Sequence, residues 1–164
     1  MTRHELRECI FKILFQIPFL EEEEVPSDVL KDAAEGKSVT EKAADNLGDE
    51  EAYFIAELEL GTKGYLGYDK EMTEEDSKYI KKKVDDIRGH ITDIDNILKD
   101  LSGGKGLDWY GKPELAILRL AVYEIQFDED IPAKVAVNEA VELAKVYCDP
   151  KAAPLINGIL SGLL

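Results

Sequence analysis

Apolar residues recur at intervals of three and four along most of this chain of 164 residues, and no strand-like alternation competes with this pattern. These intervals match the turn of an α-helix, which takes about 3.6 residues, so each such stretch can present one apolar face to a core. The pattern therefore predicts an all-α fold. A chain of this length can bury one substantial core without disulfide or metal support, and a single domain over residues 1–164 is expected.

Glycine, proline and capping residues divide this pattern into helices. The predicted helices cover residues 5–17, 49–60, a long stretch of about 27 residues after Thr73, and three stretches that begin near Pro113, Pro132 and Pro150. Acidic residues after Thr73 favour a helix N-terminus there, and the glycines of Ser102–Gly106 end the long helix. Residues 1–72 are thus expected to hold amino-terminal helices with an acidic insertion at about 21–48, and residues 73–164 a carboxyl-terminal bundle.

The strongly acidic composition is confined to one region. The formal net charge is −15, and residues 21–76 alone hold 19 acidic and five basic side chains. A negative protein repels the phosphate backbone, so the average charge argues against nucleic acid as a partner. Outside that region the two signs nearly balance, and residues 1–20 and 77–106 each hold a small basic excess. Basic surface is therefore available at two places.

No group of side chains in the sequence predicts catalysis. Neither of the two histidines, His4 and His90, has a second histidine four residues away, so no metal site is expected. No serine or cysteine lies in a recognisable nucleophile motif, and Gly61–Gly67 lacks the Gly-Lys-Ser/Thr ending of a phosphate-binding loop. We therefore expect a protein that is not an enzyme and needs no cofactor.

The cysteines and the short apolar runs indicate the compartment. Cys9 and Cys148 lie far apart without a Cys-x-x-Cys spacing, so they are interpreted as core-filling residues under reducing conditions. No apolar run reaches the roughly 18 residues that span a bilayer, and the first residues do not resemble a secretory signal. These features favour a cytoplasmic protein without membrane contact.

One aromatic pair has two interpretations. Trp109 and Tyr110 lie near Lys105 and Lys112, and aromatic faces beside basic side chains bind unpaired bases by stacking. The same pair can instead pack inside the helical bundle. Packing is the favoured interpretation, and the stacking platform is the alternative.

The carboxyl-terminal third carries the most specific pattern. It reads ILRLAVYEI at 117–125, DIPAKVAVNEAVELAK at 130–145 and NGIL at 157–160. Together with Arg7–Cys9 in the first predicted helix, these segments resemble the NusB family (N-utilisation substance B) in their order and spacing. The matching segments cover roughly half of the chain.

The resemblance implies a fold and a function. The fold would be two small helical bundles in one compact domain. The function would be transcription antitermination, by binding a boxA-like single-stranded RNA together with the ribosomal protein NusE in the RNA polymerase antitermination complex, in support of ribosomal RNA transcription. The residues that the resemblance places on the RNA surface are Arg3, His4, Arg7, Lys112 and Lys151.

A partner surface is expected around Tyr123, Glu124, Phe127 and Asp128, because an exposed aromatic beside acids suits a basic ribosomal protein. An alternative function is an acidic helical interaction module that keeps the NusE surface but binds RNA weakly or not at all. A homodimer that buries the basic face is also compatible with such a fold.

Four further side chains are given structural roles. Phe15 is expected to pack in the core. Arg119 is expected to pair with a carboxylate of a neighbouring helix, such as Glu139. Asn138 and Asn157 are expected to cap or bridge helices.

Overall fold

The computed structural model describes residues 1–16 and 73–164, and all regular structure in these two ranges is helical. In chain order the elements are α1 (Arg3–Gln16), α5 (Glu74–Gly89), α6 (Ile91–Leu101), the short 3-10 helix η2 (Leu107–Trp109), α7 (Lys112–Gln126), α8 (Ala133–Tyr147) and α9 (Ala152–Ser161). The all-α prediction is confirmed. The predictions for the acidic insertion at 21–48, the helix at 49–60 and Gly61–Gly67 lie outside the described residues.

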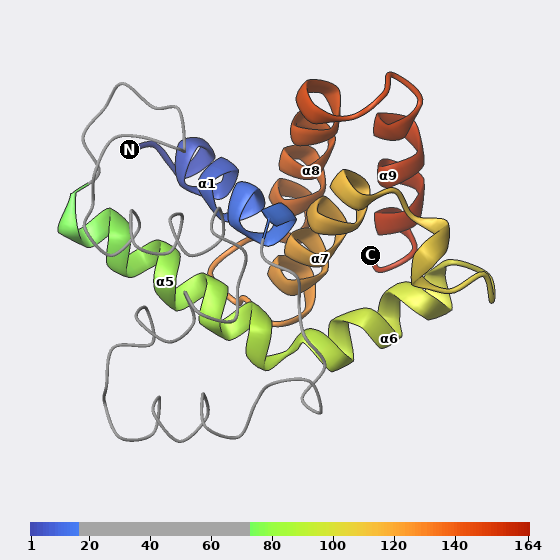
Figure 1. Cartoon of the computed structure of the whole chain (residues 1–164), viewed down its shortest axis with the longest axis horizontal. Coiled ribbons are helices and arrows are strands. Elements are labelled where there is room, and N and C mark those ends of the chain that lie inside the picture. Colours follow the sequence, from blue (N-terminus) through green and yellow to red (C-terminus); the bar gives the residue numbers. More distant parts are fainter. Residues whose placement is uncertain (17–72) are drawn as a thin grey trace.

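Helix α7 is the centre around which the other described helices are arranged. It contacts α1, α5, α6, α8 and α9, with α8 and α9 on one side of it and α1 on the other, while α5 and α6 run past as a bent pair (Figure 1). A helix with apolar residues on nearly every face is stable only when it is buried. The buried residues of α7 are Ala116, Ile117, Leu118, Leu120, Ala121, Val122, Tyr123 and Glu124.

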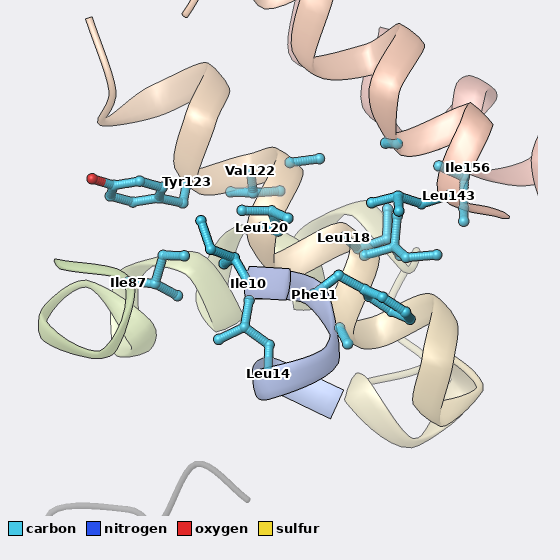
Figure 2. Close-up of a cluster of buried hydrophobic side chains, with 14 of the residues drawn as sticks. Ile10, Phe11, Leu14, Ile87, Leu118, Leu120, Val122, Tyr123, Leu143 and Ile156 are labelled. Atoms are coloured by element: carbon cyan, nitrogen blue, oxygen red, sulfur yellow. The ribbon is translucent and has the colours of Figure 1, made fainter. Parts of the chain in front are cut away.

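One hydrophobic cluster joins these helices. Every described α-helix contributes to it: Ile10, Phe11 and Leu14 come from α1, Ile87 from α5, Ile94 from α6, Leu118, Leu120 and Val122 from α7, Leu143 from α8 and Ile156 from α9 (Figure 2). Leu118 and Ile156 are fully buried. Truncation of such a side chain to alanine costs about 2–5 kcal/mol, so the cluster fixes the helix positions from which the polar surface is built.

The prediction of one long helix after Thr73 is wrong, because the chain bends at His90. Helix α5 ends at Gly89 and α6 begins at Ile91, while His90 itself adopts φ −106° and ψ 8°. Its backbone N–H donates to the carbonyls of both Asp86 and Ile87 at 3.1 Å. Gly89, directly before the bend, favours it, because glycine weakens a helix by about 1 kcal/mol relative to alanine. The imidazole also stacks on Phe127 with ring centroids 4.4 Å apart, a contact that favours the bend.

The predicted helix starts are confirmed where local signals define them. Thr73 and Asp76 form a capping box, in which each side chain accepts a hydrogen bond of 3.1 Å from the other's backbone N–H. Pro113 lies in the first turn of α7, and Pro132 is the N-cap of α8. The last helix begins at Ala152, shortly after Pro150.

Candidate nucleic-acid interface

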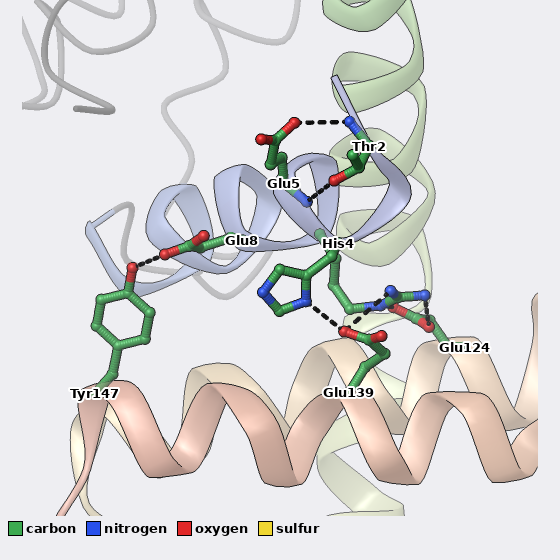
Figure 3. A network of polar contacts seen from close by, with 8 residues as sticks. Thr2, His4, Glu5, Glu8, Glu124, Glu139 and Tyr147 are labelled. Atoms are coloured by element: carbon green, nitrogen blue, oxygen red, sulfur yellow. Dashed lines mark hydrogen bonds and ion pairs between the residues drawn. The ribbon is translucent and has the colours of Figure 1, made fainter. Parts of the chain in front are cut away.

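Helix α1 brings three of the predicted RNA-binding residues, Arg3, His4 and Arg7, to the junction of α5, α7 and α8. Apolar side chains hold the helix there: Leu6, Cys9, Ile10, Ile13 and Leu14 are all buried. Figure 3 shows the polar side chains of α1 that face α8, with His4 near Glu139 and Glu8 near Tyr147. The apolar residues of α1 thus fix the positions of its charged ones.

Arg7 is a buried ion-pair residue. Its Nε and Nη2 atoms donate to the two carboxylate oxygens of Glu124 at 2.8 and 2.9 Å, and Nη1 lies 3.6 Å from Glu139. Arg7 and Glu124 are 8% and 4% exposed. Burial raises the pKa of the Glu124 carboxyl, and the Arg7 guanidinium opposes that rise. The expectation that Arg7 lies on the surface is therefore wrong, and its guanidinium is engaged by carboxylates between α1 and α7.

The predicted partner-binding residues are mostly buried as well. Tyr123, Glu124 and Asp128 lie below the surface, and Phe127 is half-buried against His90. The surface exposure that this prediction assumed is thus absent for three of the four. The cause is the central position of α7. Because neighbouring helices cover nearly all of its sides, its polar side chains are buried together with its apolar ones. Their role in partner binding stays a prediction.

The inward-facing polar groups at the end of α7 and directly after it have partners on α5. Lys83 forms an ion pair with Asp128, and the Tyr123 hydroxyl donates to Asp86 at 3.2 Å. Burial, followed by the negative charges of Asp86 and Asp128, raises the pKa of Tyr123. These contacts satisfy groups that would be costly to bury alone. They fix α5 against the carboxyl-terminal half of α7.

Arg3 and His4 remain at the surface and lie on either side of α1. The Arg3 guanidinium covers the Tyr79 ring of α5 at 4.7 Å. The Nδ1 atom of His4 lies 2.6 Å from a Glu139 carboxylate oxygen on α8. Glu139 therefore contacts both His4 and Arg7, and the sequence pattern did not identify it as a polar centre. Arg3 and His4 are both accessible to a ligand.

An open groove of about 330 Å³ lies beside these residues, between α1, α5 and the beginning of α8. Arg3, Lys83, Asp130 and Glu139 are among the charged residues that line it. Ile131, Pro132 and Val135 provide apolar surface, and Val135 is 43% exposed. The groove combines both charge signs with apolar side chains, which suits a protein segment.

Lys112 and Lys151 lie at a different place from Arg3 and His4. Both are exposed, at the beginnings of α7 and α9. The beginning of α7 meets the end of α8, because Glu114 contacts the thiol of Cys148; burial and this carboxylate raise the pKa of that thiol to about 11. Along α8, the eight residues from Glu139 to Tyr147 span about 12 Å. The five predicted RNA-binding residues therefore do not form one cluster.

Several structural expectations are corrected. Phe15 is 47% exposed and stacks on Phe11 instead of packing in the core. Asn138 and Asn157 are exposed in the middle of α8 and α9, so neither caps a helix. Arg119 has the expected structural role, and its bidentate partner is Asp95 of α6, at 2.9 and 3.1 Å.

The two aromatic residues before α7, Trp109 and Tyr110, differ in whether they pack in the bundle or lie exposed. Tyr110 is 8% exposed and its hydroxyl donates to the Leu98 carbonyl at 2.6 Å, so this side chain packs in the bundle. Trp109 is 41% exposed, with the Lys105 ammonium 4.5 Å from its ring centroid. The packing interpretation is confirmed for Tyr110 and wrong for Trp109.

Residues 1–16 and 73–164 bear on two other classes of function, metal binding and membrane insertion. In these ranges no group of three or more His, Cys, Asp and Glu side chains could hold a metal ion. No helix in them is long and apolar enough to cross a membrane. The described part of the chain is helical, and its candidate site consists of exposed polar side chains on α1 and at the beginnings of α7 and α9.

Comparison with known proteins gives the family. The NusB family profile matches residues 49–164. The chain is 34% identical to the transcription antitermination protein NusB of Lachnoclostridium phytofermentans over 164 residues, covering 100% of this chain and 99% of that protein. It is 33% identical to the protein of the same name from Agathobacter rectalis over 161 residues, with 98% of each covered. The chain belongs to the NusB family.

Solved structures show the same fold. NusB from T. maritima superposes with a TM-score of 0.63 at 20% identity, covering 99% of this chain and 90% of that one. NusB from a crystal structure of the antitermination factors NusB and NusE in complex with double-stranded RNA superposes with a TM-score of 0.60 at 24% identity, covering 98% and 94%. The predicted NusB-like fold is confirmed.

Proposed function

We propose that the protein is a transcription antitermination factor that binds a boxA-like single-stranded RNA together with the ribosomal protein NusE, in support of ribosomal RNA transcription. The observation that carries this proposal is the similarity over the whole chain to proteins named transcription antitermination protein NusB. A shared fold with a NusB that was crystallised with NusE and RNA supports it. The protein would act by binding, without catalysis, within the RNA polymerase antitermination complex.

The RNA surface that we propose has two parts. Arg3 and His4 form one part on α1, and Lys112 and Lys151 form the other at the beginnings of α7 and α9. Basic side chains at separate places on the surface suit an extended strand, whose phosphates follow each other at regular distances. Arg7 would act indirectly, because its ion pair with Glu124 holds α1 in place.

The NusE surface that we propose comprises Phe127 and the groove between α1, α5 and the beginning of α8. Phe127 is half-buried, whereas Tyr123, Glu124 and Asp128 are buried. Asp130 and Glu139 add negative charge to the groove, while Val135 adds exposed apolar surface. This combination is complementary to a basic protein with apolar anchor residues.

One observation favours the second candidate function, an acidic interaction module with weak or no RNA affinity. Since Arg7 is engaged by Glu124, α1 keeps one exposed arginine, Arg3. Each phosphate contact contributes to affinity and to its salt dependence, so a small number of exposed cations predicts weak binding. A homodimer that covers the basic face would reduce RNA binding further in the free protein.

Binding of a labelled boxA-like single strand, measured at two salt concentrations with and without NusE, tests the proposal. A scrambled strand and a duplex of the same sequence are the controls. We expect sequence-selective binding that NusE tightens and that salt weakens. A stable complex with NusE but no RNA binding in any condition would favour the interaction module, and preference for the duplex would contradict single-strand recognition.

A further inference from the structure

The connector between α6 and α7 holds one large aromatic side chain out in solvent. Trp109 ends the 3-10 helix η2 and is 41% exposed, whereas the next residue, Tyr110, is 8% exposed. The Tyr110 hydroxyl donates to the Leu98 carbonyl of α6 at 2.6 Å. This anchor fixes the backbone on which Trp109 is mounted, so the exposure of the indole results from a defined conformation.

The turn before η2 restricts this conformation further. Gly103, Gly104 and Gly106 have φ values of 68°, 89° and 79°, a region that favours glycine. The Ser102 hydroxyl accepts a hydrogen bond of 3.0 Å from the Gly106 N–H. The Tyr110 ring and the indole form an edge-to-face pair, with ring centroids 5.2 Å apart and an interplanar angle of 64°. An aromatic face that is exposed and held in place loses little conformational entropy when a ligand stacks on it.

The charges around the indole are mainly positive. The Lys105 ammonium lies 4.5 Å from the ring centroid, and the exposed Lys112 follows three residues after Trp109. Asp108 is the acidic side chain within the same connector. Basic side chains near an exposed aromatic face are typical of proteins that bind single-stranded nucleic acid, where bases stack and phosphates pair with the cations. An aromatic anchor for a basic protein would require acidic neighbours instead.

We propose that the Trp109 indole stacks on an unpaired RNA base, while Lys105 and Lys112 bind the adjoining phosphates. This inference rests on the proposed RNA-binding function and extends it, because it places a base contact next to Lys112. The contact between the Lys105 ammonium and the ring is exposed to solvent, and exposed cation–π contacts are weaker than base stacking. An arriving base can therefore displace it, and the ammonium then pairs with phosphate. Bases in a duplex already stack on each other, so the site would select single strands.

The chain supplies a direct probe for this contact, because Trp109 is its one tryptophan. Titration of the full chain with a boxA-like single strand should quench the tryptophan emission as the base stacks. Fluorescence anisotropy of the labelled RNA reports binding independently in the same titration. Quenching that follows the anisotropy curve is expected, and RNA binding without any change in emission would overturn the stacking contact while leaving RNA binding intact.

Two substitutions at this residue give the second measurement. Trp109→Ala should weaken RNA binding by about 5- to 140-fold, the equivalent of the roughly 1–3 kcal/mol that stacking on one base contributes. Trp109→Phe keeps an aromatic face and should retain most of the affinity. Leu155→Ala, at a side chain of similar exposure on α9, is the matched control and should change nothing.

The outcomes separate this inference from the function on which it rests. If wild type and Trp109→Ala bind the strand equally, Trp109 does not stack, although the protein binds RNA. If the wild type binds no RNA with or without NusE, the proposed function and this inference fail together. If Trp109→Ala loses NusE binding and keeps RNA binding, the indole is a protein contact and the inference is wrong. Circular dichroism of each variant checks that the helices are retained.

Discussion

The buried pair of Arg7 and Glu124 allows a quantitative prediction about stability. Arg7→Met leaves the Glu124 carboxylate, which is 4% exposed, without its bidentate partner. Removing one member of a buried ion pair costs about 3–5 kcal/mol. For a chain of this length, that loss lowers the melting temperature by about 6–20 °C, at roughly 2–4 °C per kcal/mol. Arg7→Met should therefore be among the more destabilising substitutions on α1.

Glu124→Leu should cost less, because the Arg7 guanidinium can turn to Glu139, which lies 3.6 Å away. A loss of about 1–3 kcal/mol is expected for a buried donor that is only partly satisfied. The double variant replaces both charges by apolar groups of similar size. Such replacements are often neutral, so we expect its stability to lie within about 1 kcal/mol of the wild type.

Urea unfolding followed by circular dichroism measures these differences, and a constant slope with denaturant checks that the transition stays comparable. The exposed pair of Lys145 and Glu142, at 3.1 Å with side chains that are 59% and 57% exposed, is the control. Its coupling should be below about 0.5 kcal/mol. If each single variant at Arg7 and Glu124 costs less than about 1 kcal/mol, or if the double variant shows the sum of the two losses, the reasoning about burial is refuted.

Three further predictions concern the surface and one helix end. Arg3→Glu should weaken boxA-like RNA binding and reduce its salt slope by about one or more, whereas Lys99→Glu on α6 should not; equal effects would remove Arg3 from the RNA surface. Phe127→Ala should weaken NusE binding by about fivefold or more without loss of helicity, and unchanged affinity in calorimetry would exclude this residue from the partner surface. Thr73→Ala should lower stability by about 1 kcal/mol in thermal unfolding while Thr73→Ser retains it, and no difference between the two would mean that the capping box is unimportant.

The sequence predicted those parts of the fold that depend on local signals. Pro113 and Pro132 mark helix beginnings because proline fits a first turn and fails in a helix interior. The bend at His90 had no comparable signal, since the apolar spacing of Ile87, Ile91 and Ile94 continues through it. A single glycine is tolerated in many helices. The stacking of His90 on Phe127 is a tertiary contact, and no local pattern reports it.

The candidate site was less predictable, because exposure depends on residues far apart in the chain. From its residue type alone, Arg7 is expected at the surface. Its spacing to Phe11 and Leu14, four and seven residues later, places it on the buried face of α1, and this signal was available in the sequence. Its partner Glu124 was not predictable in that way, because 117 residues separate the two. The prediction that Tyr123 and Glu124 of α7 are exposed is wrong, because this helix is apolar on nearly every side and is therefore buried.

The long separations between α1 and its partners have a consequence for folding. The contacts of α1 with α7 and α8 join residues 117, 135 and 139 positions apart, whereas α7, α8 and α9 follow each other through short turns. Closing a longer loop costs more entropy, and contacts with small sequence separation form earlier. The unit of α7, α8 and α9 should thus assemble first, and the docking of α1 should complete the proposed RNA surface as a late step. Local opening of the native protein would then begin with α1, so the part of the proposed surface that α1 contributes should be less protected than the part at the beginnings of α7 and α9.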